Sequence, residues 1–209
     1  MFVKSYCSSI SGIEAVTVAV EVNITAGIGM YLVGLPDNAV RESQERIRAA
    51  FENCEYKMSG KKVVVNLSPA DLRKEGSAYD LPIAVAMLAA SGQIDAAPLS
   101  RYVLLGELSL DGSILPVKGA LPIAMQALKE GFAGIILPEE NAREAAVVKG
   151  LDVYGIGNLR EVVNFLQGFT NLAPARINLD ETFTDAQQSF DGDFRDVKGQ
   201  AQVKRALEV

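Results

Sequence analysis

The sequence predicts an α/β domain with a mixed β-sheet over residues 1–169, followed by a mostly irregular C-terminal tail. Strand patterns dominate the first half of the chain, whereas helix and strand patterns alternate between residues 120 and 168. This combination is typical of a sheet covered by helices. Near residue 170 the hydrophobic periodicity stops, and residues 170–195 are polar and acidic, which predicts a linker.

The first half contains four predicted strands and two predicted helices. Residues 2–8, 13–24, 30–35 and 61–67 have strand patterns. Asp37 or Asn38 caps a helix that extends to about Phe51. Its predicted inner face consists of Val40, Ser43, Ile47, Ala50 and Phe51. Residues 80–90 are apolar nearly all round, so they predict a buried helix with Asp80 as its cap.

The second half begins with a predicted hairpin over residues 102–117, which turns at Asp111-Gly112. Helices are predicted over residues 120–130, 139–149 and 158–168, and strands over residues 134–137 and 151–156. Asn158 and Glu161 have the spacing of a capping box at the start of the last of these helices. Residues 196–209 have the pattern of a further helix.

The composition excludes several kinds of chemistry. The 209 residues carry a net charge of −6 and include no histidine. Ser-His-Asp and Cys-His catalysis are therefore excluded, and two distant cysteines, Cys7 and Cys54, do not make a metal site. Free thiols, no secretory leader and no apolar run of ~18 residues predict a cytoplasmic protein with no membrane partner.

Two groups of basic residues could contact nucleic acid: Arg41, Arg46 and Arg48 in a predicted helix, and Arg73 and Lys74 in a polar loop. In a simpler interpretation, the helix arginines form ion pairs with Glu42 and Glu45 one turn away. Arg73 and Lys74 could equally belong to a solvent-exposed loop that binds no partner. The net negative charge argues against strong, general attraction of nucleic acid to this chain.

The loop between strand 61–67 and helix 80–90 could expose a nucleophile, as strand-to-helix loops do in several enzymes. Ser77 is the candidate, and without histidine only a lysine could serve as its base. Asp80 is better interpreted as a helix cap than as a catalytic acid.

Two stretches resemble the signatures of Lon-type proteases. NLSPADLRKEGSAYDLPIAVAMLAASG (66–92) is similar to the Lon catalytic loop, and LLGELSLDGSILPVKGALPIAMQALKEGFAGIILPEEN (104–141) is similar to the segment that supplies the lysine partner of the catalytic serine. The resemblance implies that Ala78 stands at the serine position and Leu121 at the lysine position. Because neither side chain can act as a nucleophile or a base, it implies a non-catalytic domain.

Three separated blocks resemble the amino-terminal domain of the ComM/YifB family of magnesium-chelatase-like AAA+ ATPases. The blocks are VGLPDNAVRESQERIRAA, NLSPADLRKEGSAYDLPIA and GELSLDGSILPVKGALP, and the similarity spans about residues 2–168. The resemblance implies that residues 1–169 have a Lon-protease-like fold, which is related to a ribosomal small-subunit protein domain.

The tail DFRDVKGQ (193–200) looks like the lead-in of the AAA+ module, so residues 196–209 are interpreted as its truncated start. The resemblance implies that Val197, Gly199 and Gln200 lie beside the adenine of ATP in the full-length protein. No G-x-x-x-x-G-K-[ST] phosphate loop occurs in the sequence. We therefore expect no ATP hydrolysis by this chain alone.

The resemblance further implies a hexameric motor on DNA that uses ATP and Mg and acts in branch migration during natural transformation. This chain would contribute a non-catalytic domain without a cofactor of its own. Two alternatives remain from the residues. One is a regulatory, protein-binding domain of a chelatase-like ATPase with no DNA role, and the other is a residual Ser-Lys peptidase that uses Ser77 and a displaced lysine.

Overall fold

The computed structural model describes residues 1–177 and 197–208. The chain forms two compact units, Met1–Arg176 and Ile177–Val209. The predicted linker over residues 170–195 falls mostly outside the described residues. In the second unit, the helix α7 (Ala201–Glu208) occupies the stretch where a further helix was predicted.

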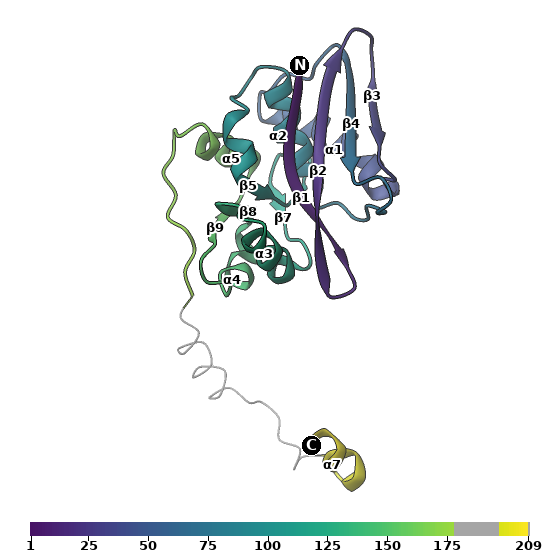
Figure 1. The fold of residues 1–209 in the computed structure, drawn as a ribbon, viewed down its shortest axis with the longest axis vertical. Coiled ribbons are helices and arrows are strands. Elements are labelled where there is room, and N and C mark those ends of the chain that lie inside the picture. The colour runs from purple at the N-terminus through teal and green to yellow at the C-terminus, as the bar shows by residue number, and fades with distance from the viewer. Residues whose placement is uncertain (178–196, 209) are drawn as a thin grey trace. The chain divides into compact units, whose positions relative to one another are not determined.

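A seven-stranded mixed sheet forms the centre of the first unit, as Figure 1 shows. Its strand order is β3-β4-β2-β1-β5-β8-β9. The neighbours β1, β2 and β4 are antiparallel, whereas β3 lies parallel to β4, and β5, β8 and β9 continue the sheet from β1 in parallel. The strands are β1 (Phe2–Ser11), β2 (Glu14–Thr25), β3 (Met30–Val33), β4 (Lys62–Ser68), β5 (Tyr102–Leu104), β8 (Gly134–Pro138) and β9 (Asp152–Ile156).

The long β1–β2 hairpin shows why alternation predicts a sheet with one buried face. Val18, Val20 and Val22 are fully buried. Residues between them point to the other face, where Glu21 forms an ion pair with Lys4 across the hairpin at 3.1 Å. Because successive side chains of a strand point to opposite faces, this pattern of buried valines fixes the register of the hairpin.

Helices pack against both faces of the sheet. On one face the Ser5 hydroxyl of β1 donates to the carbonyl of Pro82 in α2 (Asp80–Ala90), at 3.0 Å. Ile10 points to the opposite face, since it lies five residues further along β1. There it meets Gly119 at the start of α3 (Ala120–Lys129), where an added Cβ would lie 2.9 Å from its Cδ1. The other helices of this unit are α1 (Asn38–Asn53), the 3-10 helix η1 (Ala97–Arg101), α4 (Glu139–Ala145) and α5 (Leu159–Leu166).

The predicted helices of the first half are confirmed. In α1 the Asp37 carboxylate accepts a hydrogen bond from the Val40 N–H at 2.8 Å, which makes Asp37 the cap. The buried residues of α1 are Val40, Ser43, Ile47, Ala50 and Phe51, as predicted. Every residue of α2 is buried, which agrees with its apolar sequence.

The structure corrects several other predictions. Asp80 is the first residue of α2 rather than its cap: Tyr79 occupies the cap position, and no side chain caps the helix. Residues 102–104 form β5 of the main sheet, so the predicted hairpin shrinks to β6 (Glu107–Leu108) and β7 (Ile114–Leu115). β3 ends at Val33 rather than at residue 35, and α4 ends at Ala145 rather than at residue 149.

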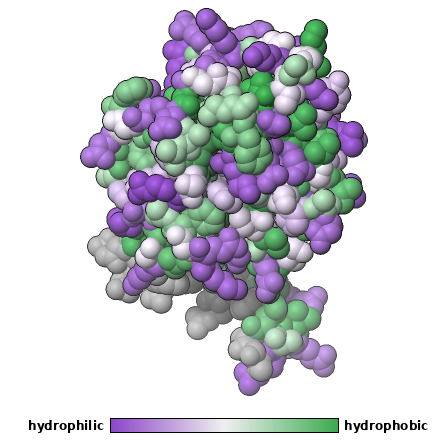
Figure 2. All heavy atoms as spheres, turned by 45° about the horizontal axis from the view of Figure 1, so that its top comes forward, coloured by the Kyte–Doolittle hydropathy of each residue, from purple (hydrophilic) through white to green (hydrophobic). Residues whose placement is uncertain are grey.

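The two edges of the sheet differ. Residues that follow α5 run along β9, where the Ala175 N–H donates to the Val153 carbonyl at 2.8 Å. β3 forms the other edge, and exposed apolar side chains gather there at Ile28, Tyr31, Val33 and Leu35. Figure 2 brings the top of the Figure 1 view forward and shows hydrophobic residues interspersed with hydrophilic ones over the face that it presents. Among the described residues, no helix is long and apolar enough to cross a membrane.

The turn at Asp111-Gly112 provides a test of packing against α1. Gly112 has φ +89°, and a Cβ on it would lie 2.4 Å from the Sγ of Cys54. We expect Gly112→Ala to lower the free energy of unfolding by about 2–3 kcal/mol, because backbone strain and overpacking add. Gly131→Ala is the matched control, since Gly131 has φ +80° with nothing within 4 Å of the added carbon.

Urea unfolding of both variants measures the difference. We expect Gly131→Ala to cost only about 1 kcal/mol, the contribution of backbone strain alone. Equal losses in the two variants would show that the contact with Cys54 contributes nothing.

Candidate functional site

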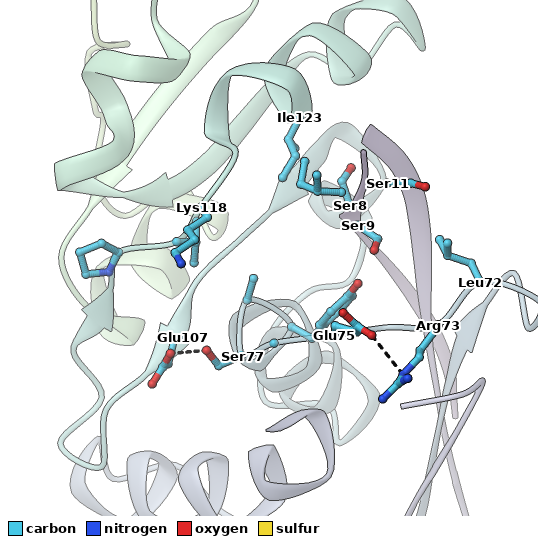
Figure 3. Close-up of a pocket in the computed structure, with 16 residues that line it drawn as sticks. Ser8, Ser9, Ser11, Leu72, Arg73, Glu75, Ser77, Glu107, Lys118 and Ile123 are labelled. Carbon is cyan, nitrogen blue, oxygen red and sulfur yellow. Dashed lines mark hydrogen bonds and ion pairs between the residues drawn. The ribbon is translucent and has the colours of Figure 1, made fainter. Parts of the chain in front are cut away.

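A cleft of about 660 Å³ lies where the end of β1, the loop before α2 and the segment before α3 meet (Figure 3). Figure 3 shows Ser8, Ser9 and Ser11 on the β1 side, Arg73, Glu75 and Ser77 along the loop, and Lys118 across from them. The cleft therefore contains the loop in which the sequence placed a candidate nucleophile.

The loop before α2 is held by the segment between β3 and α1. The Lys74 N–H donates to the Leu35 carbonyl at 3.1 Å, and the Asp37 N–H donates to the Lys74 carbonyl at 3.0 Å. The Asp37 carboxylate caps α1 with one oxygen and accepts the Gly76 N–H at 3.0 Å with the other. One short side chain thus joins the start of α1 to the glycine that precedes Ser77.

No hydrogen bond joins a serine to a lysine at this cleft among the described residues. The Ser77 hydroxyl donates instead to the carboxylate of Glu107 in β6. Lys118 lines the same cleft and is exposed, and Figure 3 shows it separate from the Ser77–Glu107 pair. The hydrogen-bond acceptor for the Ser77 hydroxyl is thus a carboxylate and not a lysine amine. The arrangement therefore lacks the serine-lysine contact that a peptidase of this type requires.

Lys74, which the sequence placed in a basic surface, is fully buried. Its ammonium donates to the carbonyl of Leu72 at 2.6 Å and to the carbonyl of Pro69. Burial lowers the pKa of Lys74, and the nearby Asp71 opposes this effect. The Lys74 ammonium therefore stabilises the loop by binding the carbonyls of that loop, and its charge does not face a ligand.

The two positions predicted to match the Lon dyad, Ala78 and Leu121, have different surroundings. Ala78 lines the cleft. Leu121 lies in the first turn of α3, is only partly buried and is not among the residues that line the cleft. Its backbone N–H donates to the Glu144 carboxylate at 2.9 Å, which ties the start of α3 to α4.

Arg46 makes a bidentate polar contact near the site. Its guanidinium donates to both oxygens of the Asp80 carboxylate, at 2.6 and 2.9 Å. Asp80 is fully buried and also accepts the Leu108 N–H of β6 at 3.1 Å. Burial raises the pKa of Asp80, and the hydrogen bonds from Arg46 and Leu108 oppose the rise.

Arg46 therefore has a structural role. The carboxylate of Glu42, its expected i,i+4 partner, lies further from the guanidinium, at 3.9 Å. The remaining basic candidates are all exposed: Arg41, Arg48 and Arg73. Arg41 and Arg73 come from different elements but line one polar cavity of about 420 Å³ at the start of α1. Arg73 is also paired with Glu75 at 3.2 Å, with both side chains mostly exposed.

Sequence reasoning missed three residues of this region: Asp37 as the link between α1 and the loop, Asp80 as the partner of Arg46, and Glu107 as the acceptor for Ser77. Only Asp80 gave a signal, because a carboxylate at the start of an all-apolar helix needs a buried partner. The other two contacts join residues 39 and 30 positions apart, and no local pattern predicts them.

The residues predicted to lie beside adenine come just before α7 in the second unit. Gly199 and Gln200 both have positive φ values, 71° and 57°, and α7 follows at once. Val197 is 46% exposed, and its carbonyl accepts a hydrogen bond from Lys204. The turn before α7 thus exposes one apolar side chain, that of Val197.

Comparison with known proteins gives the family. The family described as "Subunit ChlI of Mg-chelatase" matches residues 20–141. The chain is 41% identical to YifB of Escherichia coli over 200 residues, which cover 95% of this chain and 38% of YifB. It is 38% identical to the competence protein ComM of Haemophilus influenzae over 205 residues, which cover 98% of this chain and 40% of ComM.

The Lon-protease-like fold is supported by a more distant match. The chain is 28% identical to a Lon protease of Brevibacillus choshinensis over 161 residues, which cover 70% of this chain and 20% of that protease. The mixed α/β sheet and this similarity agree with the fold class that the sequence predicts. The chain spans about two fifths of the length of YifB and ComM.

The Arg46–Asp80 contact yields a stability prediction. We expect Arg46→Met to lower the free energy of unfolding by about 3–5 kcal/mol near neutral pH, because it leaves a buried carboxylate without its cation. Arg48→Met on the same helix is the control and should change stability by less than about 0.5 kcal/mol, since Arg48 is exposed.

The deficit of Arg46→Met should shrink as pH falls. A carboxyl whose pKa is higher in the folded than in the unfolded chain binds its proton more tightly when folded, so stability is lost as pH rises. Removing Arg46 raises the pKa of Asp80 further. Urea unfolding at about pH 7 and about pH 5 tests this; a deficit that does not depend on pH would contradict the assigned cause.

The Ser77 geometry yields a second prediction. We expect no cleavage of a fluorogenic peptide by this chain above the rate in buffer, because Ser77 bonds to a carboxylate and Ala78 carries no nucleophile. Ser77→Ala should give the same trace as the unaltered chain. Cleavage that disappears in Ser77→Ala would instead establish the residual peptidase.

Proposed function

This chain belongs to the family of Mg-chelatase subunit ChlI, and from that membership we propose that residues 1–169 are the non-catalytic front domain of a longer ATP-driven motor on DNA. The observation that carries the proposal is the similarity to YifB and ComM over nearly the whole chain, although the chain spans only two fifths of either relative. The remaining three fifths would hold the ATPase module.

ATP and Mg would bind in that longer protein. Residues 196–209 would be the start of the ATPase module, with Val197, Gly199 and Gln200 beside the adenine. The exposed turn before α7 is compatible with this role. When bound, ATP supplies the energy of the motor; this chain contributes the turn and the folded domain before it. Assembly as a hexamer and action in branch migration during transformation belong to the same proposal.

The domain would contact DNA through exposed arginines. We assign this role to Arg41, Arg48 and Arg73, and we leave out Arg46 and Lys74 because their charges are used within the fold. Arg41 and Arg48 lie seven residues apart on α1 and therefore on one helix face. Arg73 lines the same cavity as Arg41, so two elements would present positive charge at one place.

Charge reversal tests the DNA surface in the longer protein that contains this chain. We expect Arg41→Glu with Arg73→Glu to weaken binding of single-stranded and branched DNA. The dependence of log affinity on log salt should become shallower by about 2, because two phosphate contacts are lost. The control is Lys129→Glu with Arg143→Glu, which reverses the same number of charges at exposed positions of α3 and α4. This variant should leave the salt dependence unchanged.

The rival proposal is a regulatory, protein-binding domain without a DNA role. Removing residues 1–170 from the longer protein distinguishes the two. If DNA affinity and DNA-stimulated ATP hydrolysis are the same with and without these residues, the DNA role of the domain is wrong. If both fall, the proposal stands.

A further inference from the structure

The end of β1 has a free edge that faces the cleft. β1 pairs with β2 along its whole length, from Phe2 to Ser11. On its other side it pairs with β5 at a single position, Tyr6 with Val103. After β5 the chain turns away, since the Leu105 N–H donates to Ile136 and the Gly106 N–H donates to Ala78. Among the described residues, no strand therefore pairs with Ser8 to Ser11 on the side of β1 that faces away from β2.

The hydrogen-bonding groups on this edge can be assigned from the hairpin. A two-residue turn joins Ser11 to Glu14, which makes these residues a hydrogen-bonded pair. Because hydrogen-bonded and non-hydrogen-bonded pairs alternate, the backbone groups of Ser8 and Ile10 point away from β2. Tyr6 has the same parity and pairs with β5, which agrees with this assignment. The Ser8 carbonyl accepts a weak hydrogen bond from the Cys7 thiol at 3.6 Å and has a second lone pair left for another donor. Together with the Ile10 N–H it forms one position of a strand ladder at which a further strand can bind.

The side chains of the cleft suit a polypeptide better than a polyanion. Its charged residues are balanced, with two cations and two carboxylates: Arg73, Lys118, Glu75 and Glu107. Glu75 is paired with Arg73, and Glu107 accepts from Ser77. Apolar side chains of Ile10, Leu72 and Ile123 line the same cleft. A nucleic-acid strand would find no net positive charge here, whereas a peptide finds backbone partners, apolar contacts and both signs of charge.

We propose that the cleft binds an extended polypeptide segment, which adds as a strand to the edge of β1 between Ser8 and Ser11 and is not cleaved. The backbone contacts would be sequence-tolerant, and the apolar wall would favour segments with an aliphatic or aromatic side chain at alternate positions. This site differs from the surface proposed to contact DNA, which consists of Arg41, Arg48 and Arg73. Arg73 alone lines both the cleft and the cavity at the start of α1.

Binding of an unfolded model polypeptide to the 209-residue chain tests the proposal. The probe is fluorescein-labelled α-lactalbumin, reduced and alkylated with a neutral reagent, and binding is followed by anisotropy. A labelled polyproline peptide, which has no N–H donors, is the control probe and should bind at least about tenfold more weakly.

Two variants of one residue isolate the strand edge. Ile10→Pro removes the N–H that faces the cleft and leaves the neighbouring pairs with β2, whereas Ile10→Ala shortens the same side chain and keeps the N–H. We expect Ile10→Pro to bind the probe about tenfold more weakly than Ile10→Ala, because a ladder hydrogen bond is lost. Circular dichroism and thermal unfolding establish that both variants are folded.

Amide exchange in the unaltered chain decides the matter if Ile10→Pro does not fold. On saturation with the unfolded probe, exchange of the Ile10 amide should slow by about tenfold or more, while the Cys7 amide, already bonded within the hairpin, should not change. Equal binding by the two variants, an unchanged Ile10 amide, or protection by a single-stranded oligonucleotide in place of the polypeptide would overturn the proposal. None of these results bears on DNA binding through Arg41.

Discussion

The buried contact between Arg46 and Asp80 organises the functional end of this domain. Asp80 begins the all-buried helix α2, so its carboxylate would be unsatisfied without a partner. Arg46 of α1 and the Leu108 N–H of β6 supply that partner, and the three contacts join two helices and the small hairpin. The loop that leads into α2 lines the cleft together with Glu107 of β6, so the shape of the cleft depends on how α2 and the small hairpin are held.

The fold was largely predictable from sequence because its signals are local. The valines of β2, the inner face of α1 and the apolar run of α2 each report burial within one element. Errors occurred where tertiary contacts decide. Residues 102–104 look like part of a hairpin, but they pair with β8 some 30 residues later, and pairing of that kind leaves no local pattern.

The candidate site was only partly predictable, for a related reason. The loop around Ser77 stands out because a glycine-bearing polar stretch joins a strand to a buried helix. Its chemistry depends on Glu107 and Asp37, which reach it from other elements. The basic residues show the same limit. The charges of Arg46 and Lys74 are evident from the sequence, but their partners are not. Packing shows that Arg46 binds a buried carboxylate and that Lys74 binds backbone carbonyls.

If Ala78 and Leu121 occupy the Lon dyad positions, as the sequence predicts, the contacts of the loop explain how the cleft keeps its shape without the dyad. Lys74 and Asp37 hold the loop from within, so its conformation does not depend on a catalytic serine or lysine. Loss of the dyad would then leave the free edge of β1 and its apolar wall in place. Strand addition uses backbone groups rather than a nucleophile, and so binding can persist after hydrolysis is lost.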